Sequence, residues 1–347
     1  MNQSINTGIF PSKLKLAKVI PIYKKDNKTL LNNYRPISLL PVISKIFEKI
    51  IHRQIYQYFK VNNLLTENQY GFLEGLSTEL ATMELTNRLY KHMDDNKIPF
   101  SVFIDLSKAF DTIDHTILIQ KLNYYGLEGA SLNLLTNYLT DRTQYVSFND
   151  CNSNILPIKC GVPQGSILGP LLFIIYTNDI VQVDTKFKLI MYADDTTLYT
   201  TLEDLGKNTH DINRNINLSL ASISDWFKIN KLSLNIGKTK YMLFHTSQRK
   251  SPKLNIEINT NEVEKLDHFN FLGLEIDTHL NWNIHIKKIS GKILCLIGII
   301  SRFKYLLPQY VLQTIYTTLI APHFHYCLLI WGCNMDKIIK LQKELLE

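Results

Sequence analysis

The sequence predicts an α+β fold, on three observations. Residues 101–106 and 189–193 are apolar runs with the length of buried strands, and each run meets an acidic residue near its end. Residues 211–228 instead place apolar side chains three or four positions apart, which is the period of an amphipathic helix. Glycine- and proline-containing blocks such as residues 161–166 separate these segments. Strands and helices are therefore expected to share one chain, in which no internal repeat is visible.

The N-terminal part is expected to form two strands and a helix. Residues 19–23 have the composition of a short strand leading into a turn, and a second strand begins within residues 33–38. Arg35 should be extended because it precedes a proline. A helix is expected from Ser44 onward. The apolar side chains expected on one face of that helix are Ile46, Phe47, Ile50, Ile51 and Ile55.

Further elements follow in chain order. A strand with alternating apolar residues is expected at 232–235, and it runs into a lysine-containing turn at 237–240. The remaining expected helices cover residues 113–122, which Gly126 ends, 167–175, 211–228 and the region from His285 on, which Pro308 and Pro322 divide.

The bulk composition is that of an ordinary globular protein with a basic balance. The chain has 347 residues, of which 45% are hydrophobic and 20% charged. Its net charge of +7 is compatible with a polyanionic partner such as a nucleic acid. No apolar run approaches the roughly 18 residues of a membrane span, so no membrane partner is expected.

The N-terminus and the cysteines favour an intracellular location, nuclear or cytoplasmic rather than secreted. Residues 1–6 lack the pattern of a signal peptide. The five cysteines are an odd number and have no zinc-site spacing, which favours a reducing compartment with buried thiols. They are Cys151, Cys160, Cys295, Cys327 and Cys333.

Asp194 and Asp195 are the residues that point most directly to chemistry. Two carboxylates about 4 Å apart repel by roughly 4 kcal/mol at an effective dielectric near 20. Partial burial in the surrounding apolar run adds a desolvation cost. A bound cation would offset both terms, and oxygen-rich sites favour Mg²⁺ or Mn²⁺. Asp105, near the end of another apolar run, could complete a two-metal site. The alternative for Asp195 alone is a turn aspartate.

Taken together, the motifs resemble the reverse transcriptase domain of non-LTR (LINE-type) retrotransposons, in particular the insect jockey group. The resemblance extends from about residue 20 to residue 331. Each block alone is weak or moderate, and the ordered set is specific. The blocks are residues 34–40, 69–72, 103–111, 161–166, 192–195, 238–239 and 271–273.

The resemblance implies a right-hand polymerase fold and an RNA-directed DNA polymerase activity. Fingers are expected at residues 1–100, truncated at the N-terminus, and a palm with an antiparallel sheet at 101–276, which includes helices between fingers and palm. A thumb truncated at the C-terminus is expected at 277–347. The implied cofactors are two Mg²⁺ (or Mn²⁺) ions, and the implied partners are an RNA template, a DNA primer and dNTPs. An endonuclease domain is expected to be missing from this fragment.

The family motifs also imply roles for single residues near the metals. Asp105, Asp194 and Asp195 would be the catalytic metal ligands. Lys238 would protonate the leaving pyrophosphate, with Lys240 as a rival for that role and a solvated lysine as the alternative.

Other motif positions would bind the nucleotide. Lys24 and Arg35 match positions that hold the triphosphate, and Lys25 competes with Lys24. Phe110 would lie under the sugar and collide with a 2′-hydroxyl, or else be a core residue. Gln164 and Gly165 would touch the nascent base pair or the template, or else only form a turn before a helix.

Basic residues near the C-terminus would hold the template–primer duplex. Phosphate neutralisation would make this binding salt-dependent. The alternative is a charged face exposed to solvent. The residues are Lys287, Lys288 and Lys292, with Arg302 and Lys304 further along.

Two other functions remain open on the sequence. One is a catalytically weak or inactive remnant that only binds nucleic acid. The other is a different Mg²⁺-dependent phosphoryl-transfer enzyme, such as a nuclease. Arg35, Phe110 and Gln164 argue against a nuclease, because these residues suit nucleotide selection rather than cleavage.

Overall fold

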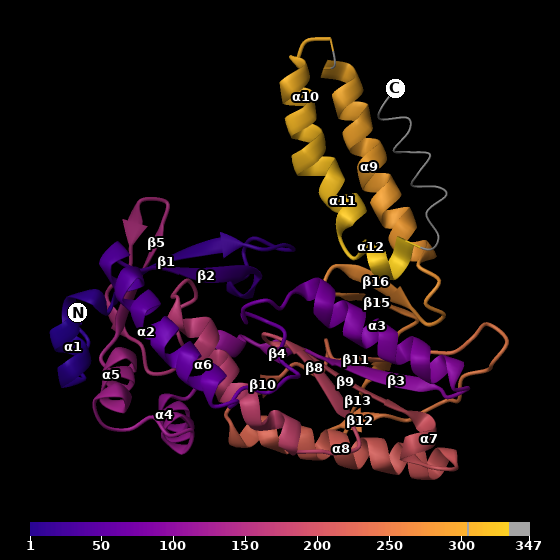
Figure 1. The fold of residues 1–347 in the computed structure, drawn as a ribbon, viewed down its shortest axis with the longest axis horizontal. Helices are drawn as coiled ribbons and strands as arrows, with labels where there is room; N and C mark the ends of the chain where they lie inside the picture. Colours follow the sequence, from indigo (N-terminus) through magenta and orange to yellow (C-terminus); the bar gives the residue numbers. More distant parts are fainter. Residues whose placement is uncertain (304, 333–347) are drawn as a thin grey trace.

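A five-stranded sheet with the order β14-β11-β3-β9-β8 lies at the centre of the molecule (Figure 1). The computed structural model describes residues 1–303 and 305–332. Neighbouring strands pair antiparallel, except β11 and β14, which pair parallel. The predicted antiparallel sheet is therefore present, with one parallel edge strand. The strands are β3 (Pro99–Ile104), β8 (Lys188–Tyr192), β9 (Asp195–Thr201), β11 (Lys240–Leu243) and β14 (Glu264–Lys265).

Helices cover both faces of this central sheet. β3 is buried along its whole length, and successive side chains point to opposite faces. Phe103 belongs to one core together with residues of α3 (Thr78–Asp94). Val102 and Ile104 belong to the other core, which includes the apolar face of α8 (Thr209–Ile229). Figure 1 shows α3 and α8 on opposite sides of the sheet. The uninterrupted apolar run of β3 is explained by these two cores.

A second sheet has the order β2-β1-β5-β6, with β7 also paired to β5. β1 pairs antiparallel with β2 and parallel with β5. This pairing joins strands from residues 143–157 to the N-terminal strands, whereas α3 packs on the central sheet. Segments on both sides of residue 100 therefore contribute strands to this second sheet. The strands are β1 (Leu16–Tyr23), β2 (Tyr34–Leu39), β5 (Thr143–Phe148), β6 (Cys151–Asn152) and β7 (Leu156–Pro157).

The helix predicted from Ser44 is α2 (Val42–Val61), but the predicted buried face is partly wrong. Ile46 and Ile50 are exposed, while the side chain of Glu48 is buried. One Glu48 carboxylate oxygen accepts hydrogen bonds from the backbone N–H groups of Ile167 and Leu168. Glu48 thus satisfies the first N–H groups of α6 (Leu168–Thr177), and α2 is rotated so that Glu48 rather than its most apolar face points inward.

The remaining helices lie around the second sheet and along the side of the central sheet that is lower in Figure 1. They are α1 (Asn2–Thr7), α4 (His115–Tyr124), α5 (Gly129–Leu139), α6 (Leu168–Thr177) and the short α7 (Leu202–Leu205). Short 3₁₀ turns lie at η1 (Ser12–Leu14), η2 (Leu31–Asn33), η3 (Ala109–Asp111) and η4 (Asn178–Gln182).

Three two-stranded sheets flank the central sheet. β4 (Leu106–Ser107) pairs with β10 (Ser233–Leu234), β12 (Glu257–Ile258) with β13 (Asn261–Glu262), and β15 (His268–Phe271) with β16 (Leu274–Asp277). β10 is the strand expected at residues 232–235, shortened to its two paired residues.

A helical hairpin projects away from the body of the molecule (Figure 1). α9 (Asn283–Phe303) forms one arm, and α10 (Gln309–Ile315) begins the other just after the predicted break at Pro308. At Pro322 no break occurs, because helix continues through a π-helical turn, η5 (Tyr316–Ile320), into α11 (Ala321–His325). α12 (Leu328–Trp331) follows. Lys304 and residues 333–347 of the expected thumb lie outside the described residues.

The thiols are not uniformly buried: Cys151, Cys160 and Cys295 are exposed and only Cys327 is buried, while Cys333 lies outside the described residues. Within residues 1–303 and 305–332, we find no helix whose length and apolar character would let it cross a membrane.

Candidate active site

The adjacent acids Asp194 and Asp195 lie at the tip of the β8–β9 hairpin. Tyr192 pairs with Asp195, so Ala193 and Asp194 form a two-residue turn. On the other side of β9, Ile104 pairs with Thr196. Asp105 follows Ile104 and therefore comes next to Asp195, across strands that are about 4.8 Å apart. The structure thus brings together the three acids that lie far apart in the sequence.

The local environment shifts the acid–base equilibria of the hairpin carboxylates. Burial raises the pKa of Asp195 to about 6, and the nearby carboxylates of Asp194 and Asp105 add to that rise. Burial, with the charge of Asp105, also raises the pKa of Asp194, although Arg35 and Lys24 oppose the shift. Each of the two acids is therefore destabilised in its charged form, and a cation placed between them would relieve this cost.

The same carboxylates do not form a closed metal cage. Among residues 1–303 and 305–332, no group of three or more His, Cys, Asp or Glu side chains is arranged to hold an ion. The donor type nevertheless fits Mg²⁺, which usually takes one or two carboxylates and completes its shell with water and substrate phosphates. The metal site remains a prediction.

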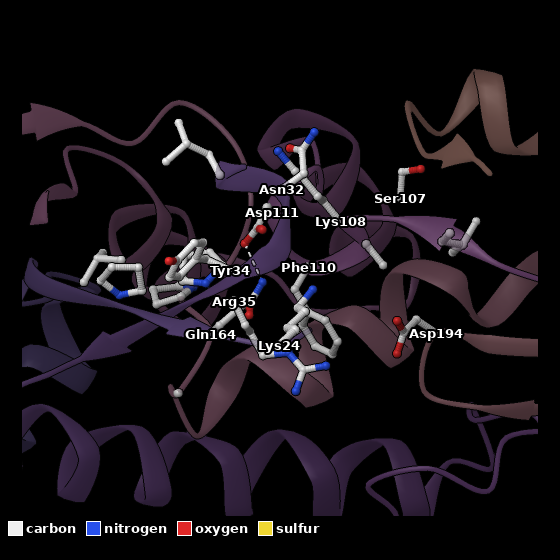
Figure 2. Close-up of a pocket in the computed structure, with 18 of the residues that line it drawn as sticks. Lys24, Asn32, Tyr34, Arg35, Ser107, Lys108, Phe110, Asp111, Gln164 and Asp194 are labelled. Carbon is white, nitrogen blue, oxygen red and sulfur yellow. Dashed lines mark hydrogen bonds between the residues drawn. The ribbon is translucent and has the colours of Figure 1, made fainter. Parts of the chain in front are cut away.

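A large pocket of about 1540 Å³ opens between the two sheets, next to these acids. Figure 2 shows side chains from β1–β2, from the segment after β3 and from the β8–β9 hairpin converging on it. All the residues predicted to be catalytic or to bind nucleotide line this pocket: Lys24, Arg35, Asp105, Phe110, Gln164, Gly165, Asp194, Asp195 and Lys238.

The basic residues of the second sheet face the acids of the first. Arg35 pairs with Ile22 across β1 and β2, and the backbone N–H of Lys24 donates to the carbonyl of Asn33 at 2.9 Å. Both side chains are close enough to lower the pKa of Asp194. Lys25, the rival of Lys24, does not line the pocket. The pocket therefore has a cationic wall and an anionic wall.

Phe110 has both of the environments considered for it. Its ring stacks on Phe173 with 4.8 Å between centroids, and its edge meets the ring of Phe72 at 6.3 Å. It also lines the pocket and is only partly buried. Phe173 is fully buried and stacks against the Phe110 ring. The Phe110 ring therefore has little room to move back from the pocket into the core.

Residues 22–276 match the family described as reverse transcriptase (RNA-dependent DNA polymerase). The chain belongs to the reverse transcriptase family. It is 29% identical to the probable RNA-directed DNA polymerase from transposon X-element of Drosophila melanogaster, over 98% of this chain and 37% of that protein. It is 27% identical to the RNA-directed DNA polymerase from mobile element jockey of the same species, over 100% of this chain and 39% of that protein. The predicted family and its jockey-like character are confirmed.

Solved structures of the same fold support this assignment at the level of architecture. The apo telomerase of Candida tropicalis, truncated from its C-terminal domain, has a TM-score of 0.52 and 15% identity, covering 78% of this chain and 55% of that one. The telomerase of Candida albicans has a TM-score of 0.51 and 14% identity over 97% of this chain and 61% of that one. The predicted α+β polymerase fold is confirmed. The chain spans about two fifths of the length of the curated relatives named above.

Within this reverse transcriptase fold, the structure separates Lys238 from its rival Lys240. The Nζ atom of Lys238 lies 3.9 Å from a carboxylate oxygen of Asp105, at the edge of the pocket. Lys240 instead forms an ion pair with Glu264 at 2.7 Å and does not line the pocket. Of the two lysines, Lys238 is the one that lines the pocket, and its role toward a leaving group stays a prediction.

Asp111 was not singled out by the sequence, although it stands directly after Phe110. The side-chain amide of Gln164 donates to its carboxylate at 2.9 Å, as the dashed line in Figure 2 shows. Burial raises the pKa of Asp111, while Gln164 and the charges of Lys108 and Lys24 oppose the rise. A carboxylate can only accept, so the Gln164 amide turns its N–H group toward Asp111. The signal available in the sequence was an acidic residue inside a motif block.

Gly165 is required by its position beside β2. Its φ is +117°, and a Cβ atom there would lie 2.7 Å from the carbonyl oxygen of Ser38. The Ser38 N–H donates to the Gln164 carbonyl at 2.7 Å. The loop that presents Gln164 is thus fixed to the second sheet by close backbone contact.

The basic residues predicted to hold nucleic acid lie on α9, outside the pocket. Lys287, Lys288 and Lys292 are all exposed. Lys288, however, forms an ion pair and hydrogen bond with Glu275 of β16. Its charge therefore already has a partner within the protein, and its role as a phosphate ligand stays a prediction.

Proposed function

We propose that this chain carries the polymerase activity of an RNA-directed DNA polymerase of a non-LTR retrotransposon. In this reaction the 3′-hydroxyl of a primer attacks the α-phosphate of a dNTP, and pyrophosphate leaves. The observation that carries the proposal is that one pocket holds the hairpin acids and Asp105 opposite Lys24 and Arg35, with Phe110 between the two walls. Family membership supports the same activity.

Asp105, Asp194 and Asp195 would hold the two Mg²⁺ (or Mn²⁺) ions. When bound, such ions lower the pKa of the attacking hydroxyl and neutralise charge that develops on the leaving group. The raised pKa values of Asp194 and Asp195 support this role, because a cation favours their charged forms.

The cationic wall of the pocket would bind the triphosphate. The Arg35 guanidinium offers two parallel N–H donors to phosphate oxygens, and Lys24 offers a point charge. Lys238, close to Asp105, would give a proton to the departing pyrophosphate. Together these cationic groups would stabilise the negative charge that develops in the transition state, between the two walls of the pocket.

The aromatic and amide groups of the pocket would select the nucleotide. Phe110, supported by Phe173, would leave no space for a 2′-hydroxyl and so favour deoxynucleotides. Gln164, oriented by Asp111, would contact the nascent base pair or the template. Both roles require that these side chains stay in place, which their contacts support.

The proposed partners are an RNA template and a DNA primer, bound in part by lysines of α9. Nuclear or cytoplasmic action follows from the proposed reaction. An endonuclease domain stays a proposed companion of the polymerase activity, as the resemblance to this family implies.

A primer-extension assay on a homopolymeric RNA template with Mg²⁺ tests the proposal. The unmodified chain should extend the primer, and Asp194→Asn should reduce the rate by about a thousandfold or more, since it removes a metal-binding charge. Equal incorporation by both proteins would contradict the role of Asp194.

Two controls separate the alternative functions. A nuclease would shorten a labelled primer–template without dNTPs. A remnant that only binds nucleic acid would retain RNA in a salt-sensitive manner without metal and would not extend any primer.

A further inference from the structure

The loop before α3 contacts the catalytic hairpin through a buried glutamine that the proposed function does not use. The side chain of Gln69 is 1% exposed. Its Oε1 atom accepts a hydrogen bond from the backbone N–H of Ala193 at 3.0 Å and another from Gly71 at 2.7 Å. Its Nε2 atom has no partner among the residues that the structure describes. The amide is therefore held only through its oxygen, and one of the two bonds goes to the hairpin turn.

The backbone around Gln69 is attached to the same hairpin. Met191 donates to the carbonyl of Asn68 at 2.8 Å, and Tyr70 donates to the carbonyl of Met191 at 2.7 Å. A Cβ atom on Gly71 would lie 2.3 Å from the backbone nitrogen of Ala193. This spacing leaves no room for a side chain at position 71. The loop and the hairpin tip are thus packed backbone against backbone.

The turn that Gln69 contacts has an unfavourable conformation. Ala193 has a φ of +57°, in the left-handed region where a Cβ atom is sterically disfavoured. Two-residue hairpin turns with positive φ strongly prefer glycine, asparagine or aspartate. Ala193 immediately precedes Asp194 and Asp195, so a change at this residue would redirect both carboxylates. A contact that stabilises the turn also fixes the direction of the acids.

We propose that Gln69 is a positioning residue that holds Ala193 in this conformation and thereby orients Asp194 and Asp195. The expected effect on kcat rests on the proposed polymerase function. The expected effect on the conformation of the turn rests on the hydrogen bonds alone. It extends the site beyond the pocket, since Gln69 does not line it.

Substitution by methionine isolates the hydrogen bond from packing. Gln69→Met keeps the shape of the side chain but removes the acceptor of the Ala193 and Gly71 N–H groups. Asn178→Leu is the matched control: Asn178 is also a buried amide, and it bonds to Leu64 and Thr66 in the segment just before this loop. It has no contact with the hairpin turn. Both variants lose buried hydrogen bonds, so both should lower the melting temperature.

Two measurements then separate positioning from stability. Hydrogen exchange at the Ala193 amide should be about tenfold faster in Gln69→Met and unchanged in Asn178→Leu, because the acceptor is lost only in the first. Single-nucleotide extension should show kcat lowered about tenfold or more in Gln69→Met, with KM for the dNTP within about threefold.

A second substitution tests the link to Ala193. Ala193→Gly accepts a positive φ without steric cost, so Gln69→Met/Ala193→Gly should regain at least about threefold of the kcat that Gln69→Met loses. Unchanged exchange at Ala193 in Gln69→Met, an equal kcat loss in Asn178→Leu, or no recovery in the double variant would overturn the proposal. If the unmodified chain extends no primer, the proposed function fails, and the exchange measurement still decides whether Gln69 holds the turn.

Discussion

At the scale of single residues, the site is defined by charges that the fold makes unfavourable. Asp194 and Asp195 share a hairpin tip next to Asp105. Burial raises the pKa of both; the charge of Asp105 adds to the rise for each, and the charge of Asp194 adds to it for Asp195. Arg35 and Lys24 offset only part of this cost for Asp194. Sites with such groups in a cleft are candidates for function, because the cost has a use only when a ligand relieves it.

This electrostatic cost should appear as a dependence of stability on pH. The pKa of Asp195, about 6 in the folded protein, lies above its unfolded value near 3.9. The folded state therefore binds more protons between those values, and stability falls as pH rises through 6. At pH 7.5 without divalent metal, Asp195→Asn should raise the melting temperature by about 1–3 °C, a small effect because the side chain is partly exposed.

At about pH 3, below both pKa values, the same substitution should have little effect, because Asp195 is then mostly protonated in both states. Asp225→Asn, at an exposed aspartate paired with Lys228, serves as the control and should show no such pH-dependent gain. A gain for Asp195→Asn that is equal at both pH values would contradict the assigned cause.

Phe110 leads to a prediction about substrate choice. Phe110→Val should raise the ratio of kcat/KM for ribonucleotides to that for deoxynucleotides by about tenfold or more, since space opens for a 2′-hydroxyl. Phe173→Leu is the matched control, because it disturbs the same ring stack without lining the pocket. It should lower stability and, because it loosens the support of the Phe110 ring, raise the ratio by less than Phe110→Val does. Steady-state single-nucleotide incorporation measures both, and equal ratios for Phe110→Val and the unmodified chain would exclude a sugar-selecting role.

At the scale of elements, α9 carries lysines with different surroundings on one helix. Lys287 and Lys292 are exposed, whereas Lys288 is paired with Glu275 of β16. Lys287→Gln and Lys292→Gln should each weaken binding of the primer–template and reduce the slope of log K against log salt by up to about 1. Lys288→Gln should leave that slope nearly unchanged. Filter binding at several salt concentrations distinguishes these outcomes, and equal slopes for all three variants would contradict the distinction.

The elements that the sequence predicts best are those whose pattern is local. The apolar run before Asp105, the run before Asp194 and the helical period of residues 211–228 are all found as expected. The buried face of α2 was mispredicted because Glu48 is drawn inward by the start of α6, a contact from a distant segment. The parallel pairing of β1 with β5 has no local signature either.

The site shows the same division. Motif order placed Asp105, Asp194, Arg35 and Phe110 in one pocket, which the structure reproduces. The choice between Lys238 and Lys240 needed the ion pair of Lys240 with Glu264. The contacts of Asp111 and Gln69 depend on which polar groups tertiary folding leaves buried, so pattern alone did not reveal them.

At the scale of the whole molecule, the pocket exists because two sheets meet. The central sheet supplies the acids, and the sheet of β1, β2 and β5 supplies the basic wall and, through Ser38, supports the loop of Gln164. The chain's net charge of +7 favours approach of a nucleic acid to this cleft. Neither sheet alone contains a complete site, so activity requires their relative placement to be maintained.

A shared metal site depends on Asp105, which follows β3, acting together with the acids of the β8–β9 hairpin. The most direct measurement is the single-turnover rate of primer extension by Asp105→Asn and by Asp114→Asn. Asp114 is an aspartate close in sequence that pairs with Lys231 and does not line the pocket. The account predicts a loss of about a thousandfold or more for Asp105→Asn and a change of no more than about threefold for Asp114→Asn. Extension by Asp105→Asn at the rate of the unmodified chain would contradict a shared metal site at this pocket.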